Sequence, residues 1–288
     1  MPQFLIDFFN LIFIQPVTNA LVVFYDTFVT IGLPGAFGFA IIGITLLLRI
    51  LMHPFFRQQM DTAKKMKEIK PHLDTLQKKH KKDPQMLQKE QMRLYQEAGI
   101  NPAGGCLFAI IQIPLIYGLY HTLQLFLTHD SDGKIIREIN DKLYHPALAI
   151  SRIDPNFFVY NLALSPAQSG LWYYYLVPVL TAVLQYFQTK VTMPQMDEPK
   201  KSASVDASTD KGKQKELKNK DKKEEPSAAD EFQRAMGTQM KYIFPVMIGY
   251  FSYTLPLGLS LYWNTFSLFS IIQHYIDEKR AKAVVTSK

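Results

Sequence analysis

Hydrophobic and polar positions are sharply segregated along this chain of 288 residues. Windows of about 20 almost uncharged residues alternate with segments crowded with lysine, and about 20 helical residues, each rising 1.5 Å, cross the hydrocarbon core of a bilayer. The pattern therefore predicts an all-α integral membrane protein. Five transmembrane helices are expected, at 33–56, 103–127, 170–189, 240–255 and 256–275.

The first 32 residues are apolar but are interrupted by Asp7, Pro16 and Asp26. The stretch NALVVFYDTFV is typical of an amphipathic helix that lies in the outer membrane interface. A sixth span is the alternative, and the three interrupting residues disfavour it. We therefore predict an outer interfacial segment over 1–32.

Residues 57–102, between the first two predicted spans, are polar and basic. Apolar side chains recur there at the spacing of one helix face: Met66, Ile69, Leu73 and Leu76. Asp83 and Pro84 then provide an N-cap and a first-turn residue for a second helix. This predicts a cytosolic helical hairpin, whose methionines either form an adaptable binding face or fill the seam between the helices.

The remaining connecting segments differ in composition. Residues 128–169 mix Leu, Tyr, Phe and Pro with few charges and are predicted to form an extracytoplasmic loop. Residues 190–239 are of low complexity, carry charges of both signs and contain few large apolar side chains, which predicts a disordered cytosolic loop. Residues 276–288 are expected to form a short cytosolic tail.

The distribution of Lys and Arg predicts the orientation. The segments on one side of the membrane hold 26 of them: 57–102, 190–239 and 276–288. The segments on the other side hold four, all within 128–169. Because cytoplasmic loops carry the excess of positive charge, the N-terminus is expected outside and the C-terminus in the cytosol. The net charge of +7 follows largely from this topology, and no DNA partner is expected.

No motif of hydrolytic or redox chemistry occurs in the sequence. The seven histidines are scattered, and HExxH, Gly-rich phosphate loops and GxSxG are absent. The single cysteine, Cys106, allows no internal disulfide and fits no metal-binding spacing. We therefore expect no enzyme activity, no cofactor and no metal. The first residues lack the features of a signal or transit peptide, which favours a bacterial plasma membrane.

One charged residue, Arg49, lies within the first predicted span, in ITLLLRILMHPFF (44–56). Its long side chain either snorkels to the nearby inner interface or faces a water-filled cavity, because a charge on a lipid-facing surface is costly. The predicted spans contain amides but no carboxylate that would pair with Arg49. An unpaired cation among amides requires water or a visiting anion, which favours a wet cavity open to the cytosol.

Three motifs resemble signatures of the YidC/oxidase-assembly/Albino-type membrane protein insertases. LLLRILMHP resembles the first-span arginine motif, and LYQEAGINPAGGCLFAIIQIPLIYGLY (94–120) resembles the loop-to-second-span signature. LPLGLSLYWNTFSLFSIIQHY (255–275) resembles the last-span signature. The resemblance covers about residues 20–280 and implies a short bacterial form. Its spans would surround a hydrophilic groove that opens to the cytosol and to lipid.

The resemblance implies a client-binding groove with four residues of this chain. Arg49 corresponds to the groove arginine, Gln112 and Trp263 match positions that look toward the groove, and Gln185 is a polar wall residue. For Trp263, a place in the interfacial aromatic belt is the alternative. Phe266 departs from the family pattern, in which a serine is common at this position, and this puts the polarity of the groove near the last span in question.

The function implied is that of a membrane protein insertase and chaperone. It would move hydrophobic segments of nascent proteins from the cytosol into the lipid bilayer, as a monomer. Nascent membrane proteins and the bilayer are the expected partners, with the ribosome and the Sec translocon as open candidates. Two alternatives remain: a small-anion transporter or channel that uses Arg49, and a non-catalytic membrane assembly factor.

Overall fold

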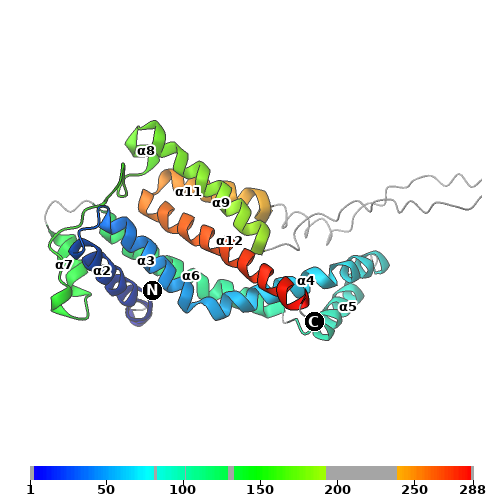
Figure 1. Ribbon diagram of the computed structural model, residues 1–288. Coiled ribbons are helices and arrows are strands. Elements are labelled where there is room, and N and C mark those ends of the chain that lie inside the picture. The colour runs from blue at the N-terminus through cyan, green and yellow to red at the C-terminus, as the bar shows by residue number, and fades with distance from the viewer. Residues whose placement is uncertain (1–2, 81–82, 101, 129–132, 193–238, 287–288) are drawn as a thin grey trace, which may run out of the picture.

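A computed structural model describes residues 3–80, 83–100, 102–128, 133–192 and 239–286 of the chain. Within these residues the chain is almost entirely helical, and its strands form a two-stranded hairpin (Figure 1). The predominantly helical class is therefore confirmed, whereas the number of spans stays a prediction. The predicted disordered loop lies almost wholly outside the described residues.

The elements follow one another in this order. The N-terminal half contains α1 (Gln3–Phe9), the π-helix η1 (Asn10–Ile14), α2 (Gln15–Thr30), α3 (Ala36–Leu51), α4 (His53–Lys79), α5 (Pro84–Glu97), α6 (Pro102–Leu127) and α7 (Lys134–Asp141). The C-terminal half contains η2 (Pro146–Leu148), β1 (Asn156–Phe157), β2 (Tyr160–Asn161), α8 (Pro166–Ser169), η3 (Trp172–Tyr175), α9 (Leu176–Thr192), η5 (Gln239–Ile243), α11 (Phe244–Thr254) and α12 (Leu257–Thr286).

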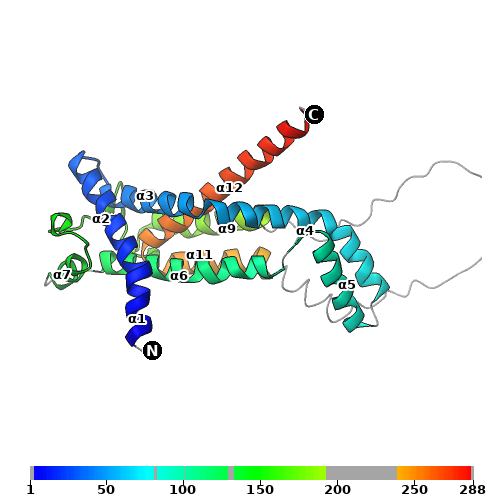
Figure 2. The same ribbon diagram turned by 90° about the horizontal axis from the view of Figure 1, so that it is seen from below.

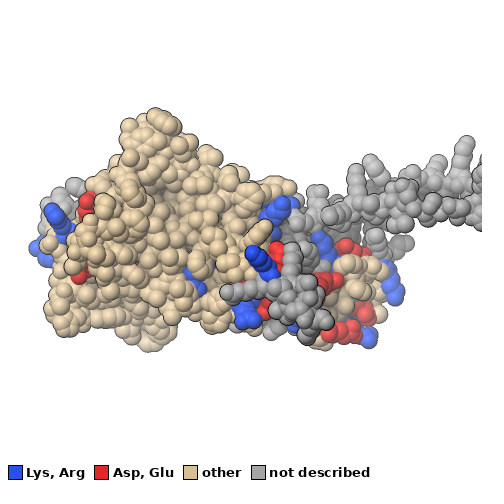
Figure 3. Space-filling model, in the orientation of Figure 1, with Lys and Arg blue, Asp and Glu red and all other residues tan. Residues whose placement is uncertain are grey.

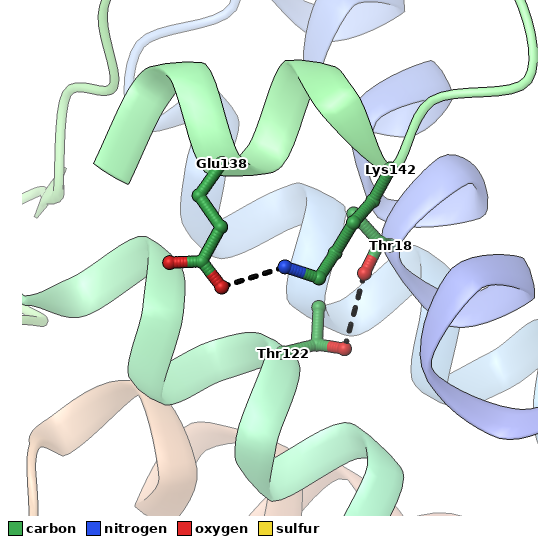
Figure 4. A network of polar contacts seen from close by, with 4 residues as sticks. All are labelled: Thr18, Thr122, Glu138 and Lys142. Atoms are coloured by element: carbon green, nitrogen blue, oxygen red, sulfur yellow. Dashed lines mark hydrogen bonds and ion pairs between the residues drawn. The ribbon is translucent and has the colours of Figure 1, made fainter. Parts of the chain in front are cut away.

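Helices α2, α3 and α6 share one apolar core. Its fully buried side chains come from all three helices: Leu21, Val22, Phe37, Ile41, Ile44, Leu119 and Leu123. The rings of Phe37 and Phe126 stack with their centroids 5.9 Å apart. The hydroxyls of Thr18 and Thr122 meet at 3.3 Å between α2 and α6 (Figure 4). This core holds α3, and with it Arg49, in place.

A chain of three buried hydroxyls joins α9, α11 and α12. Thr181 Oγ1 lies 3.1 Å from Ser252 Oγ, which lies 2.8 Å from Ser260 Oγ. Further along α12, Ser267 Oγ donates to Gln188 Oε1 at 2.6 Å. Where water is absent, polar groups must satisfy one another, so such bonds set which helices pair.

The loop between α6 and α9 is fastened to α2 near the start of that helix, at Asn19. Asn19 Nδ2 donates to the carbonyl of Lys142 at 3.0 Å, and the backbone N–H of Tyr144 donates to Asn19 Oδ1 at 2.7 Å. Lys142 Nζ also forms an ion pair with Glu138 Oε1 at 2.6 Å within α7 (Figure 4). Within the segment predicted as an extracytoplasmic loop, the described residues 133–169 thus form a cap on this end of the helices.

The β1–β2 hairpin presses a phenylalanine ring against α3. A Cβ atom added at Gly38 would overlap the ring of Phe157, and one at Gly35 would lie 2.9 Å from it. Glycine is required at this close approach because it has no side chain. The Phe157 ring also meets Phe39 edge-on, with centroids 5.3 Å apart. The hairpin therefore closes over the first turns of α3.

The helical run Asp7–Thr30 is long and apolar enough, by length and composition, to cross a membrane. Within the described residues, α3 and the first part of α4 would be a second such segment if the pair, bent by 61°, is counted as one span. Figure 2 shows α1 and α2 running across α3 and α6 rather than along them. The interfacial placement of residues 1–32 and the sixth-span alternative both stay open.

Charged side chains gather at the two ends of the face drawn in Figure 3, and the broad band between them carries almost none. Large apolar side chains are exposed along α9 and α11, among them Val179, Leu180, Val183, Phe187, Val246 and Tyr250. An exposed apolar surface of this extent is unfavourable in water and is typical of contact with lipid or with another protein.

The predicted helical hairpin is formed by α4 and α5. Asp83 is the N-cap of α5, and the backbone N–H of Met86 donates to its Oδ1 at 3.0 Å. Leu73 and Leu87 are buried, one on each helix. The helix start predicted at Asp83 and Pro84 is therefore confirmed, while the cytosolic location of the hairpin stays a prediction.

Candidate functional site

Arg49 lies in the last turn of α3, where the helix stops. The helix ends at Leu51, five residues before the predicted end of the first span, because Met52 adopts a non-helical conformation and Pro54 opens α4. Prolines are common in the first turn of a helix, where their missing N–H is not needed. The unsatisfied carbonyls at the end of α3 favour a cation at this place.

The side chain of Arg49 is buried, with 4% of its surface exposed. Among the described residues, its Nε and Nη1 atoms have no hydrogen-bond partner, and no carboxylate forms an ion pair with it. Buried charged groups normally have such partners, because losing both water and a partner is costly. The site is therefore a buried guanidinium whose Nε and Nη1 atoms can still donate hydrogen bonds to a ligand.

Aromatic rings surround the guanidinium instead. The Cζ atom of Arg49 lies 3.8 Å from the ring centroid of Phe56, 4.5 Å from that of Phe266 and 5.7 Å from that of Phe269. A cation over the face of an aromatic ring is attracted by the electrons of the ring, by about 0.5–2 kcal/mol. This attraction partly offsets the burial of the charge.

Polar groups without partners also occur along α12. Asn264 Oδ1 and Gln273 Oε1 are buried and accept no hydrogen bond from a described residue. The other polar atom of the Gln273 side chain, Nε2, lies 2.8 Å from His53 Nδ1 at the start of α4. These groups of α12 can bind water or the polar part of a visiting chain.

The other three predicted groove residues lie on three different helices. Gln185 is buried on α9, and Trp263 on α12 is half-buried against the apolar core. Gln112 lies on α6, and its side chain is outside the described residues. Among the described side chains, no hydrogen bond joins Arg49 to Gln185 or to Trp263. A common groove for all four stays a prediction.

The sequence does not predict that Phe56 and Phe269 contact Arg49. For Phe266 it shows only a departure from the family pattern, without a contact to Arg49. A weak signal exists for Phe56, because it follows Arg49 by seven residues, which is two helical turns. Nothing in the sequence indicates which rings of α12 would reach the first span. In the described part of the chain, His, Cys, Asp and Glu form no cluster that could hold a metal ion.

The fold and the site together define a class: a mostly helical protein with an exposed apolar surface and a buried arginine that has no acidic partner among the described residues. The family model described as "60Kd inner membrane protein" matches residues 29–284, so the chain belongs to this family. The resemblance to the insertase family is thereby confirmed.

Similar proteins named "Membrane protein insertase YidC" cover most of the chain. The one of Caldanaerobacter subterraneus subsp. tengcongensis is 30% identical over 250 residues, which is 87% of this chain and 89% of the relative. The one of Fusobacterium nucleatum is 30% identical over 246 residues, 85% of this chain and 88% of the relative. The one of Oceanobacillus iheyensis is 28% identical over 278 residues, 94% of this chain and 83% of the relative.

Proposed function

We propose that this protein inserts hydrophobic segments of nascent proteins from the cytosol into the lipid bilayer, and that Arg49 draws in the acidic, translocated end of the client. The observation that carries the proposal is the burial of Arg49 without a carboxylate partner among the described residues. The names of the relatives support the insertase function.

The reaction requires no covalent chemistry. Its barrier arises because the polar flank of a client must pass hydrocarbon, where each unsatisfied polar group costs several kcal/mol. A groove with polar groups such as Asn264 Oδ1 and Gln273 Oε1, which have no partner among the described residues, shortens the apolar path. The apolar segment of the client then leaves sideways, because it is more stable in lipid than in the groove.

The strength of the attraction follows from the surroundings of Arg49. Two unit charges 4 Å apart attract by about 1 kcal/mol in water and about 4 kcal/mol at the effective dielectric constant of about 20 that is typical near a protein surface. A client carboxylate at Arg49 is therefore held more firmly than in the cytosol. The attraction must remain smaller than the gain from entering lipid, or the client would stay bound.

The proposed topology assigns each segment a side of the membrane. The α4–α5 hairpin and the end of α12 face the cytosol, because Lys and Arg concentrate there. The cap formed by α7 and the β1–β2 hairpin faces outward. We place α1 and α2 in the outer interface, which is supported by their course across α3 and α6 (Figure 2).

Insertion into liposomes tests the proposal. The client is a short single-span protein with an acidic tail, and wild type is compared with Arg49→Ala, Arg49→Lys and the exposed-loop control Arg152→Ala. We expect Arg49→Ala to reduce insertion by about tenfold or more, which corresponds to about 1.4 kcal/mol, while Arg49→Lys and Arg152→Ala retain most of it. Full insertion by Arg49→Ala would refute the role of the arginine.

A further inference from the structure

Two of the rings around Arg49 form one continuous surface. The centroids of Phe56 and Phe266 are 5.8 Å apart, and their planes meet at 63°. Both lie closer to the guanidinium than Phe269 does, at 3.8 and 4.5 Å. Phe56 is itself buried, with 6% of its surface exposed. We refer to Phe56 and Phe266 together as the aromatic cover.

The aromatic cover joins parts of the chain that are far apart in sequence. Phe56 belongs to the first turn of α4, immediately after the break that ends α3, and Phe266 lies in the first third of α12. His53 and Gln273 provide a second contact between the same two helices, with Nδ1 and Nε2 2.8 Å apart. The start of α4 is therefore fastened to α12 at two places around Arg49.

The cover has a chemical consequence for Arg49. Its rings exclude water but cannot replace the hydrogen bonds of water, and Nε and Nη1 have no partner within the described part of the chain. A carboxylate satisfies such donors with charge-assisted hydrogen bonds, which are stronger than those of neutral acceptors. Excluding water also strengthens the attraction between the two charges. A dry guanidinium thus discriminates more sharply between acidic and neutral ligands than a hydrated one.

We infer that Phe56 and Phe266 are specificity-determining residues, which keep water off Arg49 and so set how strongly insertion depends on the acidic residues of the client. This inference rests on the proposed insertase function. Phe266 is the residue to change, because Phe56 lies beside the break between α3 and α4, where a substitution would disturb the backbone as well. Neither ring reacts with the client. Each ring positions the guanidinium of Arg49 and excludes water from it.

The first test is insertion of paired clients into liposomes, one with three acidic residues in its translocated tail and one with a neutral tail. For Phe266→Ser we expect the ratio of acidic to neutral insertion to fall about threefold, which corresponds to about 0.7 kcal/mol. Phe266→Leu keeps the apolar bulk and should retain most of the ratio. Leu268→Ser is the matched control, because Leu268 is exposed on the same helix. The inference is overturned if Phe266→Ser has the same ratio of acidic to neutral insertion as wild type, whether insertion of the two clients is unchanged or is reduced by the same factor.

The second test does not depend on insertion. A water-soluble dicarbonyl reagent modifies accessible guanidinium groups, and the modified peptides are quantified by mass spectrometry relative to the exposed Arg152. Modification of Arg49 should be slow in wild type and in Leu268→Ser, and several-fold faster in Phe266→Ser. Equal rates in all three proteins overturn the inference. If wild type inserts neither client, the proposed function fails, whereas the dicarbonyl rates still decide whether the cover keeps water off Arg49.

Discussion

The contact between Gly38 and Phe157 can be tested with the substitution Gly38→Ala. Its effect on the free energy of unfolding should have opposite signs in wild type and in Phe157→Ala. In Gly38→Ala the new methyl group would occupy the place of the Phe157 ring, which must leave its position against α3. In Phe157→Ala the ring that the methyl group would overlap is absent. The two backgrounds therefore separate the steric effect from the intrinsic effect of alanine in a helix.

The magnitude follows from burial and helix propensity. Full burial of a phenylalanine side chain contributes about 1.5–3 kcal/mol, and Phe157 is half-buried, so its displacement should cost about half as much. Alanine in place of glycine within a helix contributes about 0.5–1 kcal/mol in the opposite direction. In wild type, Gly38→Ala should be net destabilising by up to about 1 kcal/mol. In Phe157→Ala it should be stabilising by about 0.5–1 kcal/mol.

The free energy of unfolding in detergent micelles, measured by titration with sodium dodecyl sulfate and followed by circular dichroism, gives the four values of this cycle. Hydrogen exchange at residues 156–161 shows whether the hairpin is the part that detaches. A Gly38→Ala substitution that destabilises both backgrounds equally would refute the reasoning. The glycine would then serve the backbone or the packing of α3 against another element, not the approach of the ring.

Two further predictions concern single polar side chains. Asp83→Ala should destabilise the start of α5 by about 1 kcal/mol, because the backbone N–H of Met86 loses its acceptor. The change is measured as faster hydrogen exchange of the first turn, and Asp83→Asn should restore the protection. Unchanged exchange in Asp83→Ala would show that the cap contributes nothing. Ser252→Ala removes the middle hydroxyl between Thr181 and Ser260 and should lower the free energy of unfolding by about 0.6–1.5 kcal/mol. Its control is Thr254→Ala, which changes an exposed hydroxyl of the same helix; equal losses in both variants would contradict the network.

Local features of the fold could be predicted from the sequence because their causes are local. Asp83 followed by Pro84 is sufficient to specify a helix start, and the structure places α5 there. The predicted end of the first span, at residue 56, lies five residues beyond the end of α3 at Leu51. The apolar run continues through Phe56, and hydrophobicity alone does not reveal that a new helix begins at His53, with Pro54 in its first turn.

The candidate site could be predicted only in part. A charge in an apolar run makes Arg49 conspicuous, since its burial requires an explanation. The cover over it depends on where α12 meets the start of α4, and Phe266 is one of several aromatic residues in the last predicted span. Hydrophobic patterning does not distinguish a ring that faces lipid from one that faces the arginine. The same limit applies to Gly38, whose partner Phe157 lies more than a hundred residues away.

The continuity of α12 has a mechanical consequence. Its 30 residues form one unbroken helix from Leu257 to Thr286, about 45 Å at 1.5 Å per residue, and its last turns extend away from the other helices (Figure 2). In an unbroken helix of this length, a tilt at one end also displaces the residues toward the other end. A partner that pulls on the projecting turns would therefore shift Phe266 against Arg49 without touching either residue.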